Sequence, residues 1–234
     1  MTEGSGKKVY PEPAWSPWET VIILALSMAV SAIPYWFAGT ARGIGADLIA
    51  YLLQTACFFL LPLISVNVLR RQPLSALGLA EPEFPRCLRV GLIWGLLLYL
   101  VNVLISLGQY RLFPQYAHAQ EYIVALLDQA NGFETAFLLL LLLCLAPVSE
   151  ELLFRAFFFP ALVRRYGRAV GYLLCAAVFA ATHFDLWTML PIVCASLGFC
   201  RLYEKYRSLW YNIIAHAVWN GTALVIYCFT SLNI

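Results

Sequence analysis

The chain has 234 residues, of which 62% are hydrophobic and only 12% are charged. Soluble domains average about 45–50% apolar and about 25% charged residues, so this composition excludes an ordinary soluble domain. The formal charge of +2 is too small to indicate a nucleic-acid-binding protein, and we expect no nucleic acid among its partners. The sequence therefore predicts an integral membrane protein whose first partner is the lipid bilayer.

Residues 1–17 are polar and include Lys7 and Lys8, and no small-residue cleavage site follows them. We therefore expect a cytoplasmic N-terminal segment over 1–17 and a true membrane span after it, not a cleaved signal peptide. Seven apolar segments follow, most of them close to the ~20 residues that a helix needs to cross a ~30 Å hydrocarbon layer. In chain order they are 18–38, 47–69, 88–107, 136–162, 169–184, 186–202 and 208–229.

The lengths of these segments carry further predictions. The fourth is long for one span, so we expect it to tilt or bend. The fifth and sixth are short and adjacent, which favours a tight helical hairpin that does not reach the far surface. Between the third and fourth, His118 is expected to be a solvated surface residue. In the same connection an amphipathic helix at the outer surface is predicted by the helical spacing of apolar residues at Tyr122, Ile123, Leu126 and Leu127.

Lysine and arginine alternate between the connections. Of the fifteen, twelve lie in the N-terminal segment and in the second, fourth and sixth connections, while Arg42 and Arg111 lie on the other side and Arg155 lies within a span. The positive-inside rule requires this alternation of seven spans with a cytoplasmic N-terminus. We therefore predict an all-α polytopic membrane protein of about seven transmembrane helices. Residues 18–132 would hold the first helices and the amphipathic loop, and residues 133–234 a catalytic core.

A few polar side chains lie inside the predicted spans. At a rise of 1.5 Å per residue, Glu150 and Glu151 lie about 18 Å from the cytoplasmic end of their span, and His183 lies about 22 Å from the same side. His216 and Asn220 lie about 12 and 18 Å into the last span. A charged side chain near the bilayer centre costs about 2.5–3.5 kcal/mol on insertion scales. Because these polar residues lie at similar depths, we predict one buried polar site shared by three helices.

Spacing separates the two glutamates. Glu151 and Arg155 are at i and i+4 with the acid first, which is the favourable geometry for an ion pair within a helix. Glu150 points about 100° away around the helix and has no basic residue at i+3 or i+4. We therefore expect Glu151–Arg155 to be a structural pair and Glu150 to be the reactive carboxylate. Phe179, one turn before His183, is expected to wall the same site.

Each of these residues also has a purely structural interpretation. A buried His or Asn in a membrane bundle often makes only an interhelical hydrogen bond, and a Glu–Arg pair can hold helices together. A proton-coupled transporter would also use acids and histidines at mid-membrane, but the sequence shows no internal repeat or pair of broken helices. A second glutamate without a partner favours chemistry over structure.

Three motifs occur in order along the last part of the chain. They are E-E-x-x-x-R in EELLFR, F-x-x-x-H in FAATH and H-x-x-x-N in HAVWN. Over roughly residues 133–229 this combination resembles the CPBP family, which comprises CAAX-type prenyl proteases and bacteriocin-processing (Abi) enzymes. The resemblance implies an intramembrane endopeptidase.

The resemblance also assigns roles to residues of the motifs. Glu150 would activate water, and His183 would position that water or move its proton. His216 and Asn220 would stabilise the oxyanion of the tetrahedral intermediate. The Glu151–Arg155 pair would brace the site, as its spacing also indicates.

A metal ion is an open alternative. Glu150, His183 and His216 are ligand types that would suit zinc with one open position. Asn220, in contrast, is a poor zinc ligand and a good oxyanion donor, and no H-E-x-x-H motif is present. We therefore expect no cofactor, with zinc as the alternative.

The resemblance leaves the substrate open. It implies a membrane protein or a lipidated peptide as substrate, and we expect the chain to reside in a bacterial cytoplasmic membrane. The alternative function is a non-proteolytic scaffold or bacteriocin-immunity protein that retains the motifs. In that case Glu151 and Arg155 would matter and Glu150 would not.

Overall fold

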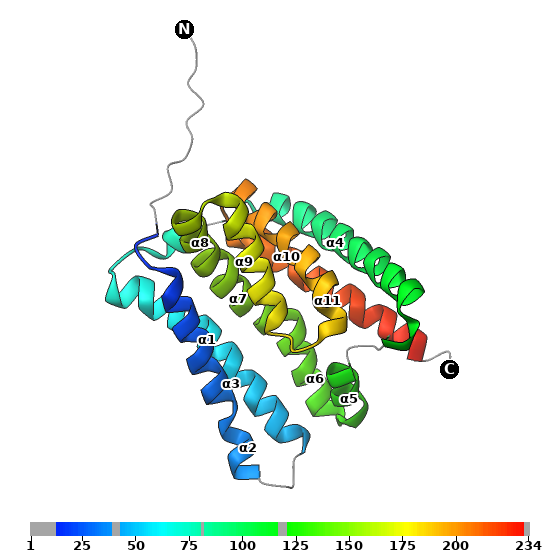
Figure 1. Ribbon diagram of the computed structural model, residues 1–234. Helices are drawn as coiled ribbons and strands as arrows, with labels where there is room; N and C mark the ends of the chain where they lie inside the picture. The colour runs from blue at the N-terminus through cyan, green and yellow to red at the C-terminus, as the bar shows by residue number, and fades with distance from the viewer. Residues whose placement is uncertain (1–12, 39–42, 81, 117–120, 232–234) are drawn as a thin grey trace.

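The computed structural model of the chain describes residues 13–38, 43–80, 82–116 and 121–231 (Figure 1). Every regular element in these ranges is helical. Six helical segments are long and apolar enough to cross a membrane, and α9 is a shorter apolar helix beside them. The prediction of an all-α polytopic fold with about seven transmembrane helices is confirmed. The elements are α1 (Pro17–Ser31), α2 (Ile33–Ala38), α3 (Ile44–Leu63), η1 (Ile64–Leu69), η2 (Leu74–Leu77), α4 (Phe84–Leu112), η3 (Pro114–Tyr116), α5 (Glu121–Gln129), α6 (Gly132–Leu140), η4 (Leu141–Leu145), α7 (Ala146–Glu151), η5 (Leu152–Phe158), α8 (Phe159–Tyr166), α9 (Arg168–Ala181), α10 (Leu186–Tyr206) and α11 (Leu209–Ser231).

The fourth span is a continuous helix of 35 residues, Gly132–Tyr166, so the prediction of an unusually long span is confirmed. Two π-helical segments, η4 and η5, interrupt it on either side of the short α-helix α7. Pro147 lies at the start of α7 and Pro160 lies just beyond η5. Because a proline cannot donate a hydrogen bond to the carbonyl four residues back, the helix widens locally at these points. Glu150 and Glu151 therefore lie between two widened segments.

Helices α9 and α10 form the predicted hairpin, with two corrections. α9 has 14 residues, which rise about 21 Å and fall short of the hydrocarbon thickness. α10 has 21 residues and is long enough to cross the membrane, so the expectation that the sixth span stops short is wrong. His183 lies in the turn between the two helices and not inside the fifth span. The cause is Asp185, which caps the start of α10 by accepting a hydrogen bond from the backbone N–H of Trp187 at 2.9 Å.

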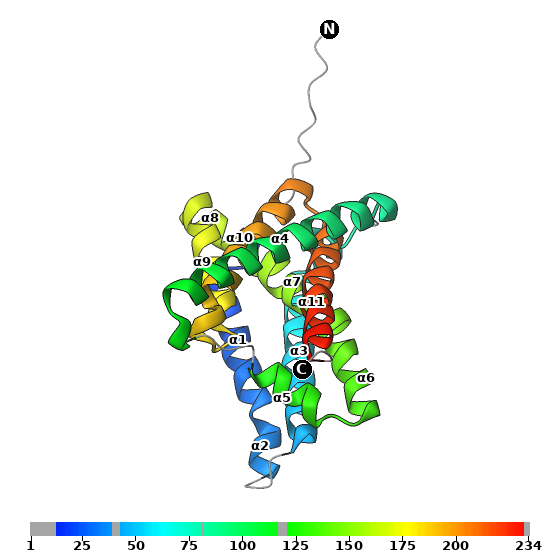
Figure 2. The same ribbon diagram turned by 90° about the vertical axis from the view of Figure 1, so that its right-hand side faces the viewer.

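Glycines bring α4 and α11 into close contact where the two helices cross (Figure 2). A Cβ atom added at Gly91 would lie 2.5 Å from Ile214 Cγ2, and one added at Gly95 would lie 2.5 Å from the carbonyl oxygen of Ala215. Small residues four apart allow membrane helices to approach this closely. Since α11 carries His216, this contact helps to position the candidate site.

The predicted amphipathic helix after the third span is present as α5. Leu126 is buried in a small cluster that includes Leu138 of α6, and Tyr227 Oη donates a hydrogen bond to Asp128 at 2.8 Å. These contacts tie α5 to α6 and to the end of α11. That α5 lies at the outer membrane surface stays a prediction. The predictions for His118, Tyr122 and Ile123 fall outside the described residues or side chains.

The two ends of the bundle differ in charge. The ends of α8 and α10 and the start of α4 lie at one end, whereas the end of α2, α5 and the end of α11 lie at the other (Figures 1 and 2). The first end is here called the arginine end, and that it faces the cytoplasm stays a prediction from the positive-inside rule. The division of the chain at residues 17 and 132 stays a prediction. The arginine end carries Arg86, Arg89, Arg164, Arg165, Arg168, Arg201, Lys205 and Arg207.

Candidate active site

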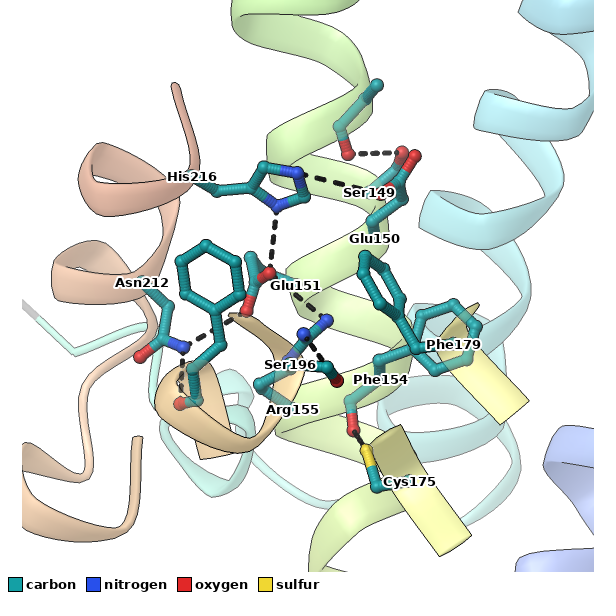
Figure 3. Close-up of polar contacts among 12 residues, drawn as sticks. Ser149, Glu150, Glu151, Phe154, Arg155, Cys175, Phe179, Ser196, Asn212 and His216 are labelled. Carbon is teal, nitrogen blue, oxygen red and sulfur yellow. Dashed lines mark hydrogen bonds and ion pairs between the residues drawn. The ribbon is translucent and has the colours of Figure 1, made fainter. Parts of the chain in front are cut away.

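Glu150 and Glu151 leave α7 in different directions (Figure 3). The side chain of Glu151 is fully buried, whereas that of Glu150 is 16% exposed and lines a cavity of about 410 Å³. The difference follows from the rotation of about 100° between successive residues of a helix. The geometry therefore agrees with the division expected from spacing: Glu151 faces partners and Glu150 faces open space.

Three side chains hold Glu151. Arg155 Nη1 lies 3.1 Å from Glu151 Oε1, and both side chains are fully buried. Asn212 Nδ2 donates a hydrogen bond to Glu151 Oε2 at 3.1 Å, and His216 Nδ1 lies 2.9 Å from Glu151 Oε1. Because an ionised carboxylate can only accept, Nδ1 of His216 carries the proton in this contact. The ion pair expected from the i, i+4 spacing is thus present, and α11 supplies two further partners.

Aromatic rings surround the Arg155 guanidinium. Its central carbon lies 4.2 Å from the centroid of the Phe179 ring and 5.1 Å from that of Phe199. Nη2 donates a hydrogen bond to Ser196 Oγ at 3.0 Å. A desolvated cation over aromatic faces gains about 2 kcal/mol. Together with Glu151, these contacts compensate for burying the charge.

His216 lies between the two glutamates. While Nδ1 contacts Glu151, Nε2 lies 3.8 Å from Glu150 Oε2, which is longer than a direct hydrogen bond. The ring stacks on Phe199 with centroids 5.1 Å apart and an interplanar angle of 26°. The orientation of the imidazole is therefore fixed on one edge and one face, and its Nε2 edge is turned toward Glu150.

His183 reaches the same cavity from the α9–α10 turn. Its Nδ1 lies 3.0 Å from the carbonyl oxygen of Phe179. Since a carbonyl only accepts, Nδ1 is the protonated nitrogen and Nε2 is the acceptor of the neutral ring. The Phe179 ring lies edge-on to His183 at 5.1 Å and to His216 at 6.1 Å. Phe179 thus forms a wall beside both histidines, as its place in the motif predicts.

Asn220 also lines the cavity. Its Nδ2 donates a hydrogen bond to the carbonyl oxygen of Leu142, in the π-helical segment η4, at 2.9 Å. The widened backbone before α7 thus binds α11 directly. One amide hydrogen of Asn220 is used in this way, and the amide has a second one to offer.

The residues that could hold zinc share the cavity without forming a metal-binding group. Glu150, His183 and His216 all line it. Across the described residues, however, no three His, Cys, Asp or Glu side chains are grouped so that they could hold a metal ion. Each histidine uses Nδ1 in a hydrogen bond within the protein. The expectation of no cofactor stays a prediction, with zinc as the alternative, and we derive no catalytic step through a metal.

Two residues of the site were not predicted from the sequence. Asn212 bonds Glu151 from one turn before His216, and its signal was available: Asn212, His216 and Asn220 follow one another at intervals of four in α11. Ser196 contacts Arg155 from α10. A single serine in an apolar helix carries no signal of such a role.

A comparison with protein families finds a match to the part of the chain that carries the site. Residues 132–222 match the family model described as type II CAAX prenyl endopeptidase Rce1-like. This segment is similar to that family. The match confirms the resemblance to the CAAX protease family, and it contains all three motifs. No curated protein and no solved structure matches the chain.

The Rce1-like segment runs from the start of α6 into the second half of α11. It includes the three residues that hold Glu151, namely Arg155, Asn212 and His216, while α4 lies outside it. The match supports a membrane-embedded protease acting on a membrane-associated substrate. The catalytic role of each residue stays a prediction.

Proposed function

We propose that the chain is an intramembrane endopeptidase of the CAAX type that uses Glu150 to activate water. The observation that carries the proposal is the position of His216, held by Glu151 at 2.9 Å and turned toward Glu150 at 3.8 Å. A site built only to join helices would have no need of the cavity-facing carboxylate beside this fixed imidazole. The Rce1-like match supports the same class of reaction.

In the proposed reaction the carboxylate of Glu150 takes a proton from water as the water oxygen attacks the scissile carbonyl carbon. His183 accepts a hydrogen bond from the same water through Nε2, its free nitrogen. When the tetrahedral intermediate collapses, the carbon–nitrogen bond breaks and Glu150 returns its proton to the leaving amine. The carboxylate is then ready for another turnover.

The oxyanion of the intermediate is stabilised by donors from α11. With Nδ1 already donating to Glu151, His216 can donate from Nε2 only as the imidazolium. Glu150 and Glu151 then balance the charges of His216 and Arg155, so the buried site is neutral before water loses its proton. Asn220 offers its second amide hydrogen. Donors fixed in a site shielded from bulk water are worth far more than in solution.

For the substrate we propose a membrane protein or a lipidated peptide, and for the location a bacterial cytoplasmic membrane. The cavity walls are largely apolar and aromatic, with the polar groups gathered around Glu150. Such walls suit a substrate segment that carries few charges and enters the cavity from the lipid.

The proposal is tested by comparing protein and peptide C-termini by mass spectrometry. Membranes would come from cells that express the wild-type chain, Glu150→Gln or Glu134→Gln at matched levels. Glu134→Gln makes the same chemical change at the start of the same span and outside the cavity, where glutamine can still accept the capping hydrogen bond from the Asn131 backbone. Defined C-termini should be present in the wild type and in Glu134→Gln and absent in Glu150→Gln. Identical profiles for all three would contradict the proposal.

The scaffold alternative is favoured by one observation, the complete set of partners around Glu151. If the chain only holds a partner in place, Glu151→Gln should abolish its cellular effect and Glu150→Gln should leave it intact. The protease predicts the loss of function in both variants.

A further inference from the structure

The inward face of α4 changes character along its length. Near the arginine end, Gly91 and Gly95 pack directly on α11. One turn farther on, the same side of the helix opens onto the cavity, where Tyr99, Asn102 and Ser106 form part of the lining. These last three residues are called the α4 stripe below. Helix packing thus closes α4 against α11 at one end and leaves a space between them at the other.

The α4 stripe is polar where the rest of the helix surface is apolar. Its members are spaced at i, i+3 and i+7, which places them on one face. The outward positions around them are leucines, and Leu100, Leu104 and Leu107 are 53%, 58% and 55% exposed. A membrane-spanning helix carries polar side chains where it lines a water-filled or ligand-filled cavity. The pattern therefore marks the cavity side of α4 as a binding surface.

Asn102 differs from the other amides at this depth. Asn212 and Asn220 each donate hydrogen bonds within the protein. Within the described part of the chain, in contrast, no hydrogen-bond partner reaches the side chain of Asn102, which is half-buried in the cavity wall. Because its amide faces the cavity and has no protein partner among the residues described, Asn102 is free to hydrogen-bond a group that enters the cavity.

The chemistry of an amide identifies the partner. A carboxamide offers two donors and an acceptor oxygen, which match the carbonyl and N–H of a peptide group. Glu150 and His216 line the same cavity from the fourth span and α11. A polypeptide in extended form between the two walls would therefore present its backbone to both.

We propose that the α4 stripe binds the substrate backbone, with Asn102 pairing a peptide group near the scissile bond. This inference rests on the proposed function. Apart from His216 and Trp219 of α11, the residues that line the cavity on α4, α10 and α11 lie at the middle of those helices or in the halves away from the arginine end. The bound polypeptide segment therefore lies in that half of the bilayer.

Photo-crosslinking tests the location. The photoreactive residue p-benzoyl-phenylalanine would replace Tyr99 in a chain that also carries Glu150→Gln, so that bound substrate is not cleaved. The matched control places the same residue at Leu100, which faces away from the cavity. We expect crosslinked polypeptide from position 99 only, and a crosslinking yield about tenfold lower when Asn102→Leu is added, as for the loss of about 1.4 kcal/mol of binding free energy. Equal yields at 99 and 100, or no effect of Asn102→Leu, would overturn the proposal.

Kinetics test the role. With a peptide that spans a cleavage site found in the C-terminal comparison, Asn102→Leu should raise KM about tenfold and change kcat little, and Asn102→Gln should restore part of the affinity. A purely structural role would instead lower the melting temperature and the yield of folded protein. If the wild type cleaves and Asn102→Leu leaves KM unchanged, the α4 stripe does not bind the substrate, and the proposed function stands. If no cleavage depends on Glu150 yet position 99 still crosslinks through Asn102, the proposed function is wrong and the binding site stands.

Discussion

The imidazole of His216 is fixed by Glu151, a residue that does not itself line the cavity. Nδ1 of the histidine lies 2.9 Å from Glu151 Oε1, and Glu151 is in turn held by Arg155 and Asn212. The position of Nε2 beside Glu150 therefore depends on a buried charged network behind it. Substitutions in that network should affect catalysis by moving His216, and substitutions of Glu150 should affect catalysis alone.

The two glutamates should separate in their effects on stability. Glu151→Gln leaves Arg155 buried without its counter-ion, which costs about 3–5 kcal/mol when one partner of a buried pair is removed. Glu150→Gln alters a cavity-facing side chain whose charged neighbour, His216 Nε2, lies 3.8 Å away, so its effect on the free energy of unfolding should be clearly smaller than that of Glu151→Gln. Thermal unfolding in detergent measures both. Equal losses for the two variants would contradict the division of roles.

Asn212 should behave as a positioning residue. Asn212→Leu removes the hydrogen bonds to Glu151 Oε2 and to the carbonyl oxygen of Phe199. Because Asn212 is fully buried and does not line the cavity, we expect kcat to fall and KM to stay close to that of the wild type. Separate measurement of kcat and KM for a substrate peptide tests this expectation. A rise in KM at unchanged kcat would show that Asn212 acts on substrate binding instead.

The contact between α4 and α11 should not tolerate a side chain at Gly95. In Gly95→Ala the added Cβ would lie 2.5 Å from the carbonyl oxygen of Ala215, so the helices must separate at a cost of about 1–3 kcal/mol. Cleavage should weaken as well, since His216 follows Ala215. Gly108→Ala in the same helix is the control, because nothing lies within 4 Å of its added Cβ. If both variants melt at the same temperature, the close packing of α4 on α11 does not contribute to stability.

Removal of metal ions should leave activity unchanged. Among the described residues, Glu150, His183 and His216 are not grouped closely enough to hold a metal ion. We expect purified protein treated with 1,10-phenanthroline and dialysed to cleave at its original rate. Loss of cleavage that returns on addition of zinc would establish the metal-dependent alternative.

Much of the site could be predicted because its residues follow helical spacing. The Glu151–Arg155 pair and the separate direction of Glu150 come from the rotation of 100° per residue, and the structure shows both. The convergence of Glu150, His183 and His216 on one cavity was predicted from depth alone. These inferences need only a helix and a membrane, which the apolar segments indicate.

Other features depend on contacts between helices and carry no such signal. The place of His183 in a turn depends on the cap at Asp185, which ends a run of apolar residues that resembles a longer helix. The partnership of Ser196 with Arg155 depends on how α10 lies against η5. Asn102 could have been noticed as a polar residue in an apolar span, but only the packing of α4 shows that it lines the cavity.

The most direct test of the central claim is the rate at which the purified protein in lipid nanodiscs hydrolyses a peptide spanning an identified cleavage site. Glu150→Gln should reduce kcat by about 10²–10⁴-fold, the usual contribution of a general base, while its melting temperature stays that of the wild type. If Glu150→Gln cleaves the peptide at the wild-type rate, Glu150 does not activate water and the account is wrong.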